Sequence, residues 1–526
     1  MDETYDVVVV GGGAAGLAGA QALGRARRSV LVVDAGEPRN APSGSVHNYL
    51  TRDGTPPADL VTIGREEATR YGAHLVTGRA EAAKRHGDGF TVTLDDGRTV
   101  GARRLLVTTG LIDELPELPG LAERWGRDVL HCPNCHGWEV RDRRVGVLAT
   151  GPLAVHQANL WRQWSHDVLL LTHGAAPPAG EEAERLAARS ITVVPGPVAE
   201  VTVADDRLTG VRLASGEIVE LDALVVGTRL TARAELLESL GLRPVEVEVS
   251  GQVIGMRVPG DQNGATEAPG VWVAGNVTDV RAQVLVAAAG GLTAGAAINA
   301  DLVAEDTRKA VDEHRHRLAT MFTEDAWEER YRSRPAVWSG QPNPVLVTEA
   351  ADLPAGRALD AGCGEGADAI WLAERGWRVT AVDLSATAVE RAIAHAATLG
   401  ADLADRVEFR HVDLAVEPPT QGTYDLVSSH FLHLPAEEQW PLFDRLAAAV
   451  TRGGTLLIVG HDPSDLRTRV GRMHFPEAMF TADQVAERLD PAGWEVLVAQ
   501  ARPRTSKDRE GRAVTVHDAV LVARRR

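Results

Sequence analysis

Cysteine is scarce in this sequence. Only three cysteines occur among 526 residues, at Cys132, Cys135 and Cys363. So low a count excludes the disulfide framework of a small secreted protein and fits a reducing cytoplasm better. The first residues include Asp2 and Glu3, where a secretory signal peptide would carry a basic region. We therefore predict a cytoplasmic protein.

Positive charge and long apolar runs are scarce as well. The chain has 55 Lys and Arg against 73 Asp and Glu, a formal net charge of −18. This balance excludes the basic footprint that nucleic acid or an anionic membrane surface would require. The longest apolar run, Val284–Ile298, is too short and too rich in glycine to span a bilayer. We predict no nucleic-acid partner and no membrane partner.

Two of the three cysteines form a Cys-x-x-Cys pair, Cys132 and Cys135, within the stretch His131–Glu139. Such a pair can close a small disulfide ring, and its reactive form is the thiolate. Structural zinc usually needs four ligands, commonly two such pairs, and the remaining cysteine lies far away in the chain. We interpret the pair as redox-active and predict no metal site.

The N-terminal residues carry the pattern of a dinucleotide site. Thr4–Val10 predicts a buried parallel strand, and Gly11, Gly13 and Gly16 follow it in the spacing G-x-G-x-x-G. These glycines allow a tight turn, close approach of a pyrophosphate and close helix packing. Ala14–Arg25 then predicts the helix whose N-terminus faces the pyrophosphate.

Later segments extend this pattern. A second strand, Ser29–Val33, ends at Asp34, a carboxylate placed to accept from a ribose hydroxyl. Leu105–Gly110 predicts a short strand that ends in Thr109 and Gly110. Thr266–Asn276 predicts another strand, ending in Ala-Gly-Asn.

In this order of motifs, residues 1–315 resemble the FAD-dependent pyridine-nucleotide disulfide oxidoreductases, and most closely the low-molecular-weight thioredoxin reductases. The resemblance implies bound FAD, with Thr109 and Gly110 among its contacts. It places Gly275 and Asn276 at the ribityl chain and Gln283 near the flavin ring. The family usually has Asp where this chain has Asn276, and an amide can still hydrogen-bond a ribityl hydroxyl.

Residues 116–244 resemble the family's inserted pyridine-nucleotide domain, with two departures. Ala149 replaces the first glycine of the fingerprint that follows the strand Arg144–Leu148. The segment Thr172–Pro178, after the strand Val168–Leu171, has no arginine for the 2′-phosphate of NADPH. Whether NADPH or NADH is used is therefore left open.

The residue after the cysteine pair is a further departure. Thioredoxin reductases have Asp there as proton donor, whereas this chain has His136, which can act as base or acid near neutrality. The resemblance implies that Cys135 faces the flavin and that Cys132 attacks an outside disulfide. With His136 and a weakened nicotinamide site, the chain is also similar to the dithiol oxidases of epidithiodiketopiperazine and dithiolopyrrolone pathways. The direction of electron flow stays open.

We place the beginning of the C-terminal part near residue 318. Trp327–Arg334 is aromatic and charged, and the prolines that follow it predict either a linker or a lid before the next nucleotide fold. That fold has an acid before a glycine loop and an acid after its second strand. The residues concerned are Asp360, Gly362, Gly364, Gly366, Asp383 and Asp413.

This constellation resembles the class I S-adenosylmethionine-dependent methyltransferases over residues 320–526. The resemblance implies that Asp360 and the glycine loop hold the methionine part of the cofactor, Asp383 the ribose and Asp413 the adenine. Cys363 is interpreted as a packing residue within the loop. His430, His433 and His461 follow the fourth and fifth strands, where such folds face their substrate, and surface or capping roles remain alternatives for them.

The predicted fold class is therefore α/β, a two-domain FAD/NAD(P)-binding fold like that of thioredoxin reductase followed by a Rossmann-like class I methyltransferase domain. The predicted domains are a discontinuous FAD-binding domain at 1–115 and 245–318, a pyridine-nucleotide-like domain at 116–244, and a methyltransferase domain at 319–526.

The predicted function is a bifunctional enzyme, a disulfide or dithiol oxidoreductase and methyltransferase that uses FAD and S-adenosylmethionine and acts on a small thiol. One alternative is an oxygen-dependent dithiol oxidase joined to a thiol methyltransferase. Another is a flavin redox sensor whose methyltransferase fold binds nucleotide without catalysis. The partners to consider are a small disulfide or dithiol, a thioredoxin-like protein, and a second copy of the chain.

Overall fold

The computed structural model describes residues 4–467, 475–508 and 510–526, so Asp2 and Glu3 lie outside the described residues. The chain forms two compact units, Met1–Thr307 and Arg308–Arg526, and each is described by itself. The division falls inside helix α7 (Val284–Met321), whereas the sequence places a boundary near residue 318.

The first unit is built on a sheet of order β3-β2-β1-β6-β5-β4, in which β19 also pairs with β6. Strands β3, β2, β1, β6 and β19 pair in parallel, whereas β5 pairs antiparallel with β6 and with β4. The apolar residues of β1, β2, β19 and the end of β6 are buried. The elements of this part are β1 (Thr4–Val10), α1 (Ala14–Arg25), β2 (Val30–Asp34), α2 (Pro57–Arg70), β3 (His74–Thr77), β4 (Ala80–His86), β5 (Gly89–Leu94), β6 (Thr99–Val107) and β19 (Val271–Val273).

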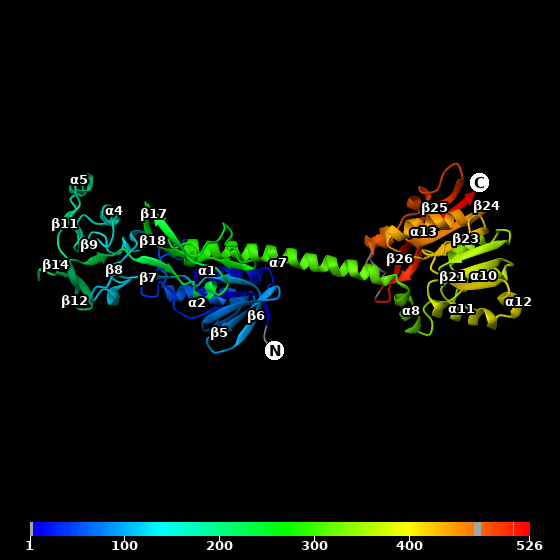
Figure 1. Cartoon of the computed structure of the whole chain (residues 1–526), viewed down its shortest axis with the longest axis horizontal. Helices are drawn as coiled ribbons and strands as arrows, with labels where there is room; N and C mark the ends of the chain where they lie inside the picture. Colours follow the sequence, from blue (N-terminus) through cyan, green and yellow to red (C-terminus); the bar gives the residue numbers. More distant parts are fainter. Residues whose placement is uncertain (1–3, 468–474, 509) are drawn as a thin grey trace. The chain divides into compact units, whose positions relative to one another are not determined.

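A second sheet of the nucleotide-binding type has the strand order β11-β10-β9-β15-β8. In the sequence it is flanked by the strands of a smaller sheet of order β17-β18-β16-β7, because β7 precedes it and β16, β17 and β18 follow it. Its strands pair in parallel, and β8, β9 and β11 are labelled in Figure 1. The side chains of β8, β9, β10 and β15 are buried. The elements are β7 (Leu111–Glu114), β8 (Val129–Leu130), α3 (Pro133–His136), β9 (Val145–Leu148), α4 (Ala154–Trp161), β10 (Val168–Leu171), α5 (Glu181–Ala188), β11 (Thr192–Val194), β12 (Val198–Ala204), β13 (Arg207–Leu213), β14 (Ile218–Glu220), β15 (Ala223–Val225), β16 (Arg229–Ala232), α6 (Glu235–Glu238), β17 (Val245–Val249) and β18 (Gln252–Arg257).

Helix α7 contributes to the core of the first unit. Ala287, Ala294, Ile298 and Leu302 pack in one apolar cluster with residues of β1 and α1. By length and composition alone, α7 is a candidate membrane span. The core helix of a soluble protein can meet the same two criteria. Within that apolar stretch, 22% of the residues are buried, and Leu285, Val286 and Leu292 are exposed.

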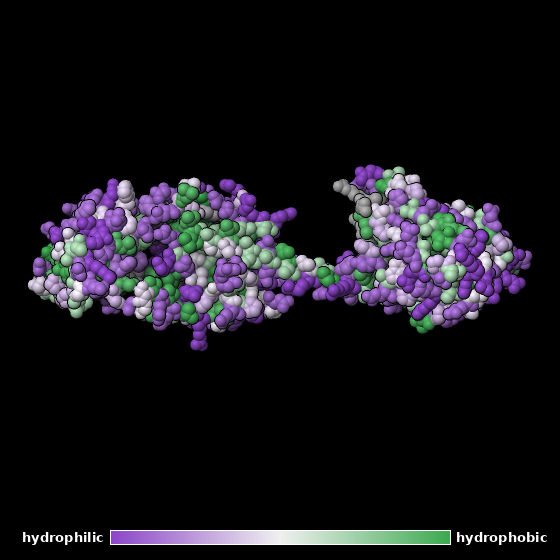
Figure 2. Space-filling view, turned by 90° about the horizontal axis from the view of Figure 1, so that it is seen from above, coloured by the Kyte–Doolittle hydropathy of each residue, from purple (hydrophilic) through white to green (hydrophobic). Residues whose placement is uncertain are grey.

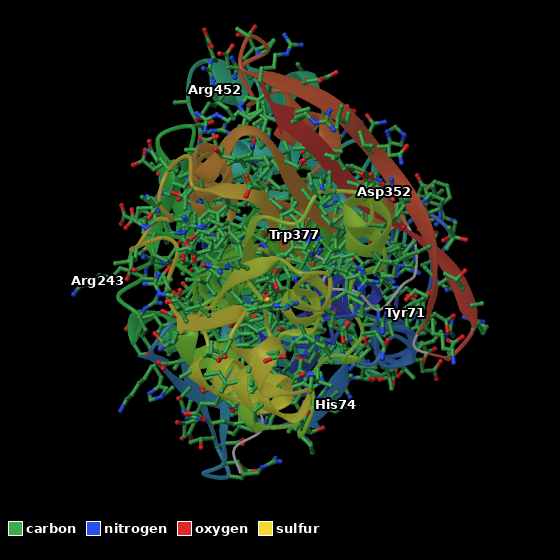
Figure 3. All side chains as sticks on the ribbon, turned by 90° about the vertical axis from the view of Figure 1, so that its right-hand side faces the viewer. Tyr71, His74, Arg243, Asp352, Trp377 and Arg452 are labelled. Atoms are coloured by element: carbon green, nitrogen blue, oxygen red, sulfur yellow. The ribbon has the colours of Figure 1, made fainter. Side chains whose placement is uncertain are left out.

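The second unit has a sheet of order β22-β21-β20-β23-β24-β26-β25, parallel except where β26 pairs with its neighbours. Trp377 lies within its apolar core, and Arg452 is exposed (Figure 3). The elements are α8 (Glu324–Arg332), α9 (Pro344–Ala350), β20 (Arg357–Ala361), α10 (Ala367–Glu374), β21 (Arg378–Asp383), α11 (Ala386–Thr398), α12 (Ala401–Ala404), β22 (Val407–His411), β23 (Tyr424–His430), α13 (Ala436–Ala449), β24 (Val450–His461), α14 (Ala482–Ala486), β25 (Trp494–Lys507) and β26 (Ala513–Arg525).

The surface carries both hydrophilic and hydrophobic residues. On the face seen in Figure 2, hydrophilic residues predominate and hydrophobic ones gather in small areas. Leu50 and Trp138 are among the exposed apolar side chains of the first unit, at 83% and 65% exposure. Trp138 follows the cysteine pair by three residues and is covered on one side by the Arg141 guanidinium, 4.2 Å from its ring centre.

Candidate functional sites

A cleft of about 1670 Å³ in the first unit is lined by all the site residues that the sequence predicts there except Gly16. It lies where the ends of β1 and β2 meet the segment after β8 that carries the cysteine pair. The predicted residues that line it are Gly11, Gly13, Asp34, Thr109, Gly110, Cys132, Cys135, His136, Gly275, Asn276 and Gln283.

The glycine loop at the end of β1 fits a dinucleotide. A Cβ on Gly16 would lie 1.9 Å from the Gly11 carbonyl oxygen, so that helix α1 can pack here only with glycine. No described atom lies within 4 Å of a Cβ built on Gly13, whose surroundings open into the cleft. This open space above a backbone turn is what a pyrophosphate requires.

Asp34 closes this loop. Its Oδ1 accepts from the Gly12 N–H at 3.0 Å, and the Arg65 guanidinium donates to its Oδ2. The carboxylate at the end of β2 therefore lies beside the loop, where the adenosine ribose of FAD would be held. The residues fit FAD in their order, in the volume available and in the open space at Gly13.

Asn276 is fixed by its neighbours. Its Nδ2 donates to the carbonyls of Asp279 (3.0 Å) and Ala282 (2.9 Å), and its Oδ1 accepts from Arg39 at 3.4 Å. An aspartate at this position would not supply the two N–H donors that hold this turn. The departure from the family pattern thus has a local structural role, and Asn276 still lines the cleft.

The cysteine pair lies at the start of the short helix α3. Cys132 is its N-cap and Cys135 lies one turn later, so that the two sulfur atoms are 2.7 Å apart. A hydrogen bond from the Cys135 thiol is the main cause that lowers the pKa of Cys132 to about 7, and the backbone N–H groups of Cys135 and Asn134 contribute. The same interaction raises the pKa of Cys135. Gln283 Nε2 lies 4.0 Å from Cys135 Sγ.

Two histidines flank the pair. Burial lowers the pKa of His136, partly opposed by Glu139, and burial likewise lowers that of His131, partly opposed by Asp113. Both imidazoles are therefore neutral at neutral pH, and a neutral imidazole can take up a thiol proton.

Residues that sequence reasoning missed complete this environment. Arg39 forms a two-pronged ion pair with Asp113, through 2.7 Å contacts from Nε and Nη2, and the Asp113 side chain is only 7% exposed. His47 lies 3.3 Å from Glu139, and Asn48 donates to the Asn134 carbonyl at 2.7 Å. No motif signals them, because the loop that carries Arg39, His47 and Asn48 is joined to α3 only by folding.

The pyridine-nucleotide loop keeps the strand–loop–helix form despite Ala149. Ala149 N donates to the Leu171 carbonyl at 2.9 Å, so that the loop after β9 stays against β10. The segment Thr172–Pro178 after β10 has no lysine or arginine, and His173 is engaged through Nδ1 by the Val198 N–H at 3.1 Å. Nothing in that segment offers the cationic clamp that a 2′-phosphate favours.

In the second unit, Asp360, the glycine loop and Asp383 lie at the carboxyl ends of β20 and β21. The Gly364 N–H donates to Asp383 Oδ2 at 2.8 Å, which joins the glycine loop to the acid after β21. Asp360 is 1% exposed, and its Oδ2 has no hydrogen-bond partner among the described residues. An orphaned buried carboxylate oxygen fits a site completed by a cationic ligand group, as the methionyl ammonium of S-adenosylmethionine would supply.

Two further side chains extend this acidic corner. Asp368 Oδ2 lies 2.7 Å from His430 Nδ1, and ligand-type atoms of Asp360, Asp368 and His430 lie within 4.8 Å of one another. Sequence reasoning singled out His430 but not Asp368, which lies in the first turn of α10. Asp413 follows β22, and its Oδ1 accepts from the Ala415 N–H at 2.8 Å.

Comparison with known proteins gives two families for the two parts of the chain. Residues 5–291 match the family described as pyridine nucleotide-disulphide oxidoreductase. Residues 358–454 match the family described as methyltransferase domain.

Individual relatives cover the first part. The thioredoxin reductase tcpT of Claviceps purpurea is 34% identical over 289 residues, which span 49% of this chain and 87% of that protein. The crystal structure of HlmI is 44% identical, covers 60% of this chain and 97% of its own, and superposes with a TM-score of 0.56. An oxidoreductase from Agrobacterium tumefaciens is 34% identical, covering 58% of this chain and 99% of its own with a TM-score of 0.53.

These matches confirm the predicted resemblance and fold class, a thioredoxin-reductase-like part joined to a methyltransferase part. They also confirm that the chain is an enzyme and that its families imply FAD, NAD(P)H and S-adenosylmethionine.

Proposed function

Because the chain belongs to the pyridine nucleotide-disulphide oxidoreductase family and carries a methyltransferase domain, we propose that it oxidises a small-molecule dithiol and methylates a thiol. The observation that carries the oxidative direction is the setting of the cysteine pair. Cys132, with a pKa lowered to about 7 by the Cys135 thiol, stands beside two neutral histidines rather than a carboxylic acid. The cytoplasm remains the proposed location.

The proposed oxidation is a thiol–disulfide exchange at Cys132. One substrate thiolate attacks Cys132 Sγ of the Cys132–Cys135 disulfide, forms a mixed disulfide and expels Cys135, whose raised pKa favours taking a proton. The second substrate thiolate then attacks the first substrate sulfur and expels Cys132 as the thiolate. The substrate has lost two electrons and closed a disulfide, and the protein pair has gained them.

His136 is the proposed base. The two substrate thiols lose two protons. Cys135 takes up one of them, and His136 takes up the other. Because burial lowers its pKa, His136 is a neutral imidazole that can accept this proton. FAD supplies a two-electron acceptor that can pass the electrons from the protein dithiol to oxygen. Gln283 and Cys135 lie together on the side of the cleft where the flavin ring is expected.

The second candidate runs in the opposite direction, as an NAD(P)H-dependent reductase of a thioredoxin-like protein or small disulfide. The similarity to the thioredoxin reductase tcpT favours it. The absence of lysine and arginine from Thr172–Pro178 argues against tight use of NADPH. A flavin redox sensor with a non-catalytic methyltransferase fold is a third candidate, which turnover with S-adenosylmethionine would exclude.

The test is an anaerobic titration of the purified flavoprotein with a small dithiol, NADPH or NADH, followed by the loss of flavin absorbance. The proposal expects rapid bleaching by the dithiol, slow bleaching by either nicotinamide, and recovery of absorbance when oxygen is admitted. Cys132→Ser is the control, since it keeps the FAD site but removes the attacked sulfur. Rapid bleaching by NADPH together with none by dithiols would establish the reductase instead.

The methyl acceptor is proposed to be a thiol because the first unit produces or consumes thiols. Methyl transfer to a thiolate needs mainly orientation and desolvation, so that no dedicated base is required. Joining both sites in one chain raises the effective concentration of one at the other. Reduced small thiols and dithiols are offered with S-adenosylmethionine, and thioethers are sought by mass. Methylation of oxygen, nitrogen or carbon acceptors alone would contradict this assignment.

A further inference from the structure

The segment 323–343, called the strap here, packs against the glycine loop of the methyltransferase part. It comprises the N-cap of α8, α8 itself and the chain that leads to α9. By sequence alone, this segment is compatible with either a linker or a lid. Its contacts lie on the two strand ends where S-adenosylmethionine is expected.

The strap is fastened at its beginning by Glu328, which is 8% exposed. The Glu328 carboxylate accepts from Thr387 Oγ1 (2.6 Å), Thr387 N (2.9 Å) and Ser385 Oγ (3.1 Å), at the start of α11. Although burial raises the pKa of Glu328, these hydrogen bonds lower it to about 2. The carboxylate therefore stays charged and holds the strap just beyond Asp383.

The middle and the end of the strap are fastened to the glycine loop and to α10. Glu365 accepts from the N–H groups of Val337 and Trp338, each at 3.1 Å. Arg391 joins Glu365 (3.0 Å) to the carbonyl of Tyr331 (2.7 Å). At the far end, the Asn343 N–H donates to Asp368 at 2.6 Å. A linker without a function would not need anchors along its whole length.

Between these anchors, Tyr331 and Trp338 face the backbone of Gly364. The Trp338 Nε1–H donates to the Tyr331 hydroxyl oxygen at 2.9 Å, and a Cβ on Gly364 would lie 3.1 Å from both groups. Tyr331 is 2% exposed, and among the described residues its hydroxyl oxygen accepts the Trp338 hydrogen bond and its O–H has no acceptor. The hydroxyl proton is thus free to donate beside the loop.

The charges around the loop are unequal. Asp360 and Asp368 lie at one end of the loop, where they suit the ammonium of the methionyl group and repel its carboxylate. On the strap side, Glu365 is paired with Arg391, and Asp383 accepts from the Gly364 N–H. Burial, and next the charge of Asp383, raise the pKa of Tyr331, so its hydroxyl keeps its proton. The Arg391 guanidinium, which is one of the strap anchors, is already engaged by Glu365 and by the carbonyls of Tyr331 and Arg334. The Tyr331 O–H is the donor that the strap presents to the loop.

We propose that Tyr331 is an S-adenosylmethionine-binding residue whose hydroxyl donates to the methionyl carboxylate, and that Trp338 is the positioning residue that turns this hydroxyl toward the loop. The strap is then a wall of the cofactor site rather than a linker. This inference does not depend on which acceptor is methylated or on the direction of the flavin reaction.

The test measures binding to the full chain by calorimetry, without any acceptor or dithiol. The probes are S-adenosylmethionine and 5′-methylthioadenosine, which lacks the amino-acid part. Tyr331→Phe should weaken S-adenosylmethionine about ten- to a hundred-fold, the usual loss for a hydrogen bond to a charged group, and leave 5′-methylthioadenosine unchanged. Trp338→Phe, which removes the Nε1 donor, should show the same selectivity with a smaller loss.

Tyr424→Phe is the matched control, because it removes the hydroxyl of another buried tyrosine of this unit, at the start of β23. It should bind both probes like the unaltered chain. Equal weakening of both probes by Tyr331→Phe, or no weakening of either, would overturn the proposal. If Tyr331→Phe fails to fold, Trp338→Phe decides by the same criterion, since it leaves Tyr331 in place.

Discussion

The reactivity of Cys132 gives a prediction that the structure makes quantitative. In the reduced enzyme, the pKa of Cys132 is lowered to about 7, first by the Cys135 thiol and further by the N–H groups of α3. A free cysteine has a pKa of about 8.5. Because the thiolate is the species that is alkylated, the rate at Cys132 should rise with pH and level off above about pH 8.

The size of the effect follows from the two pKa values. At pH 6, about 10% of Cys132 is thiolate against roughly 0.3% of a free cysteine, a ratio of about 30. Cys135, whose pKa is raised by the same hydrogen bond and by burial, should react far more slowly. The assay is iodoacetamide labelling of the reduced protein over pH 5–9, with each cysteine peptide quantified by mass spectrometry.

Two variants isolate the cause. Cys135→Ala removes the hydrogen bond that lowers the pKa of Cys132 most, and the labelling midpoint of Cys132 should move upward toward that of a free thiol. Cys363→Ala is the control, because Cys363 is buried in the second unit and its removal should leave the midpoint of Cys132 unchanged. Faster labelling of Cys135 than of Cys132, or a Cys132 midpoint near 8.5, would refute the reasoning.

Three further predictions concern other contacts. His136→Gln should slow dithiol oxidation by about 10²–10⁴-fold and remove its general-base pH dependence; an unchanged pH–rate profile would show that His136 is not the base. Arg39→Met should lower the free energy of unfolding by about 3–5 kcal/mol in denaturant titrations, because it leaves the Asp113 carboxylate buried without its cation. The exposed Arg79→Met should change it little, and equal losses would show that the Arg39 pair is not special. Asp383→Ala should abolish methylation while flavin turnover persists; loss of both activities would mean a general folding defect.

Several elements could be predicted from sequence because their cause is local. β1 and α1 have the predicted bounds, since an apolar run followed by glycines and a helical stretch leaves few alternatives. The same holds for β10, while β9 begins one residue after the predicted Arg144. The strand predicted from Thr266 is shorter, because β19 begins only at Val271, where pairing with β6 begins.

The chemical role of each motif could also be predicted from residue type and spacing. A cysteine pair two residues apart, two glycine loops and acids at strand ends limit the chemistry to redox and nucleotide binding. The pKa difference between Cys132 and Cys135 could not be predicted from the sequence, because it depends on the 2.7 Å sulfur–sulfur contact that helix α3 creates.

Only tertiary structure decided the surroundings of these motifs. Arg39 and His47 reach the cysteine site because a loop after β2 packs against α3, and no spacing in the sequence encodes that contact. For the strap, the sequence likewise shows only a run of aromatic and charged residues. Its proposed role as a wall of the cofactor site depends on the contact of Tyr331 and Trp338 with Gly364. The sequence by itself determined the folds and the chemical groups, since these follow from local patterns. Folding determined their charges and partners, since burial and distance set pKa values and hydrogen bonds.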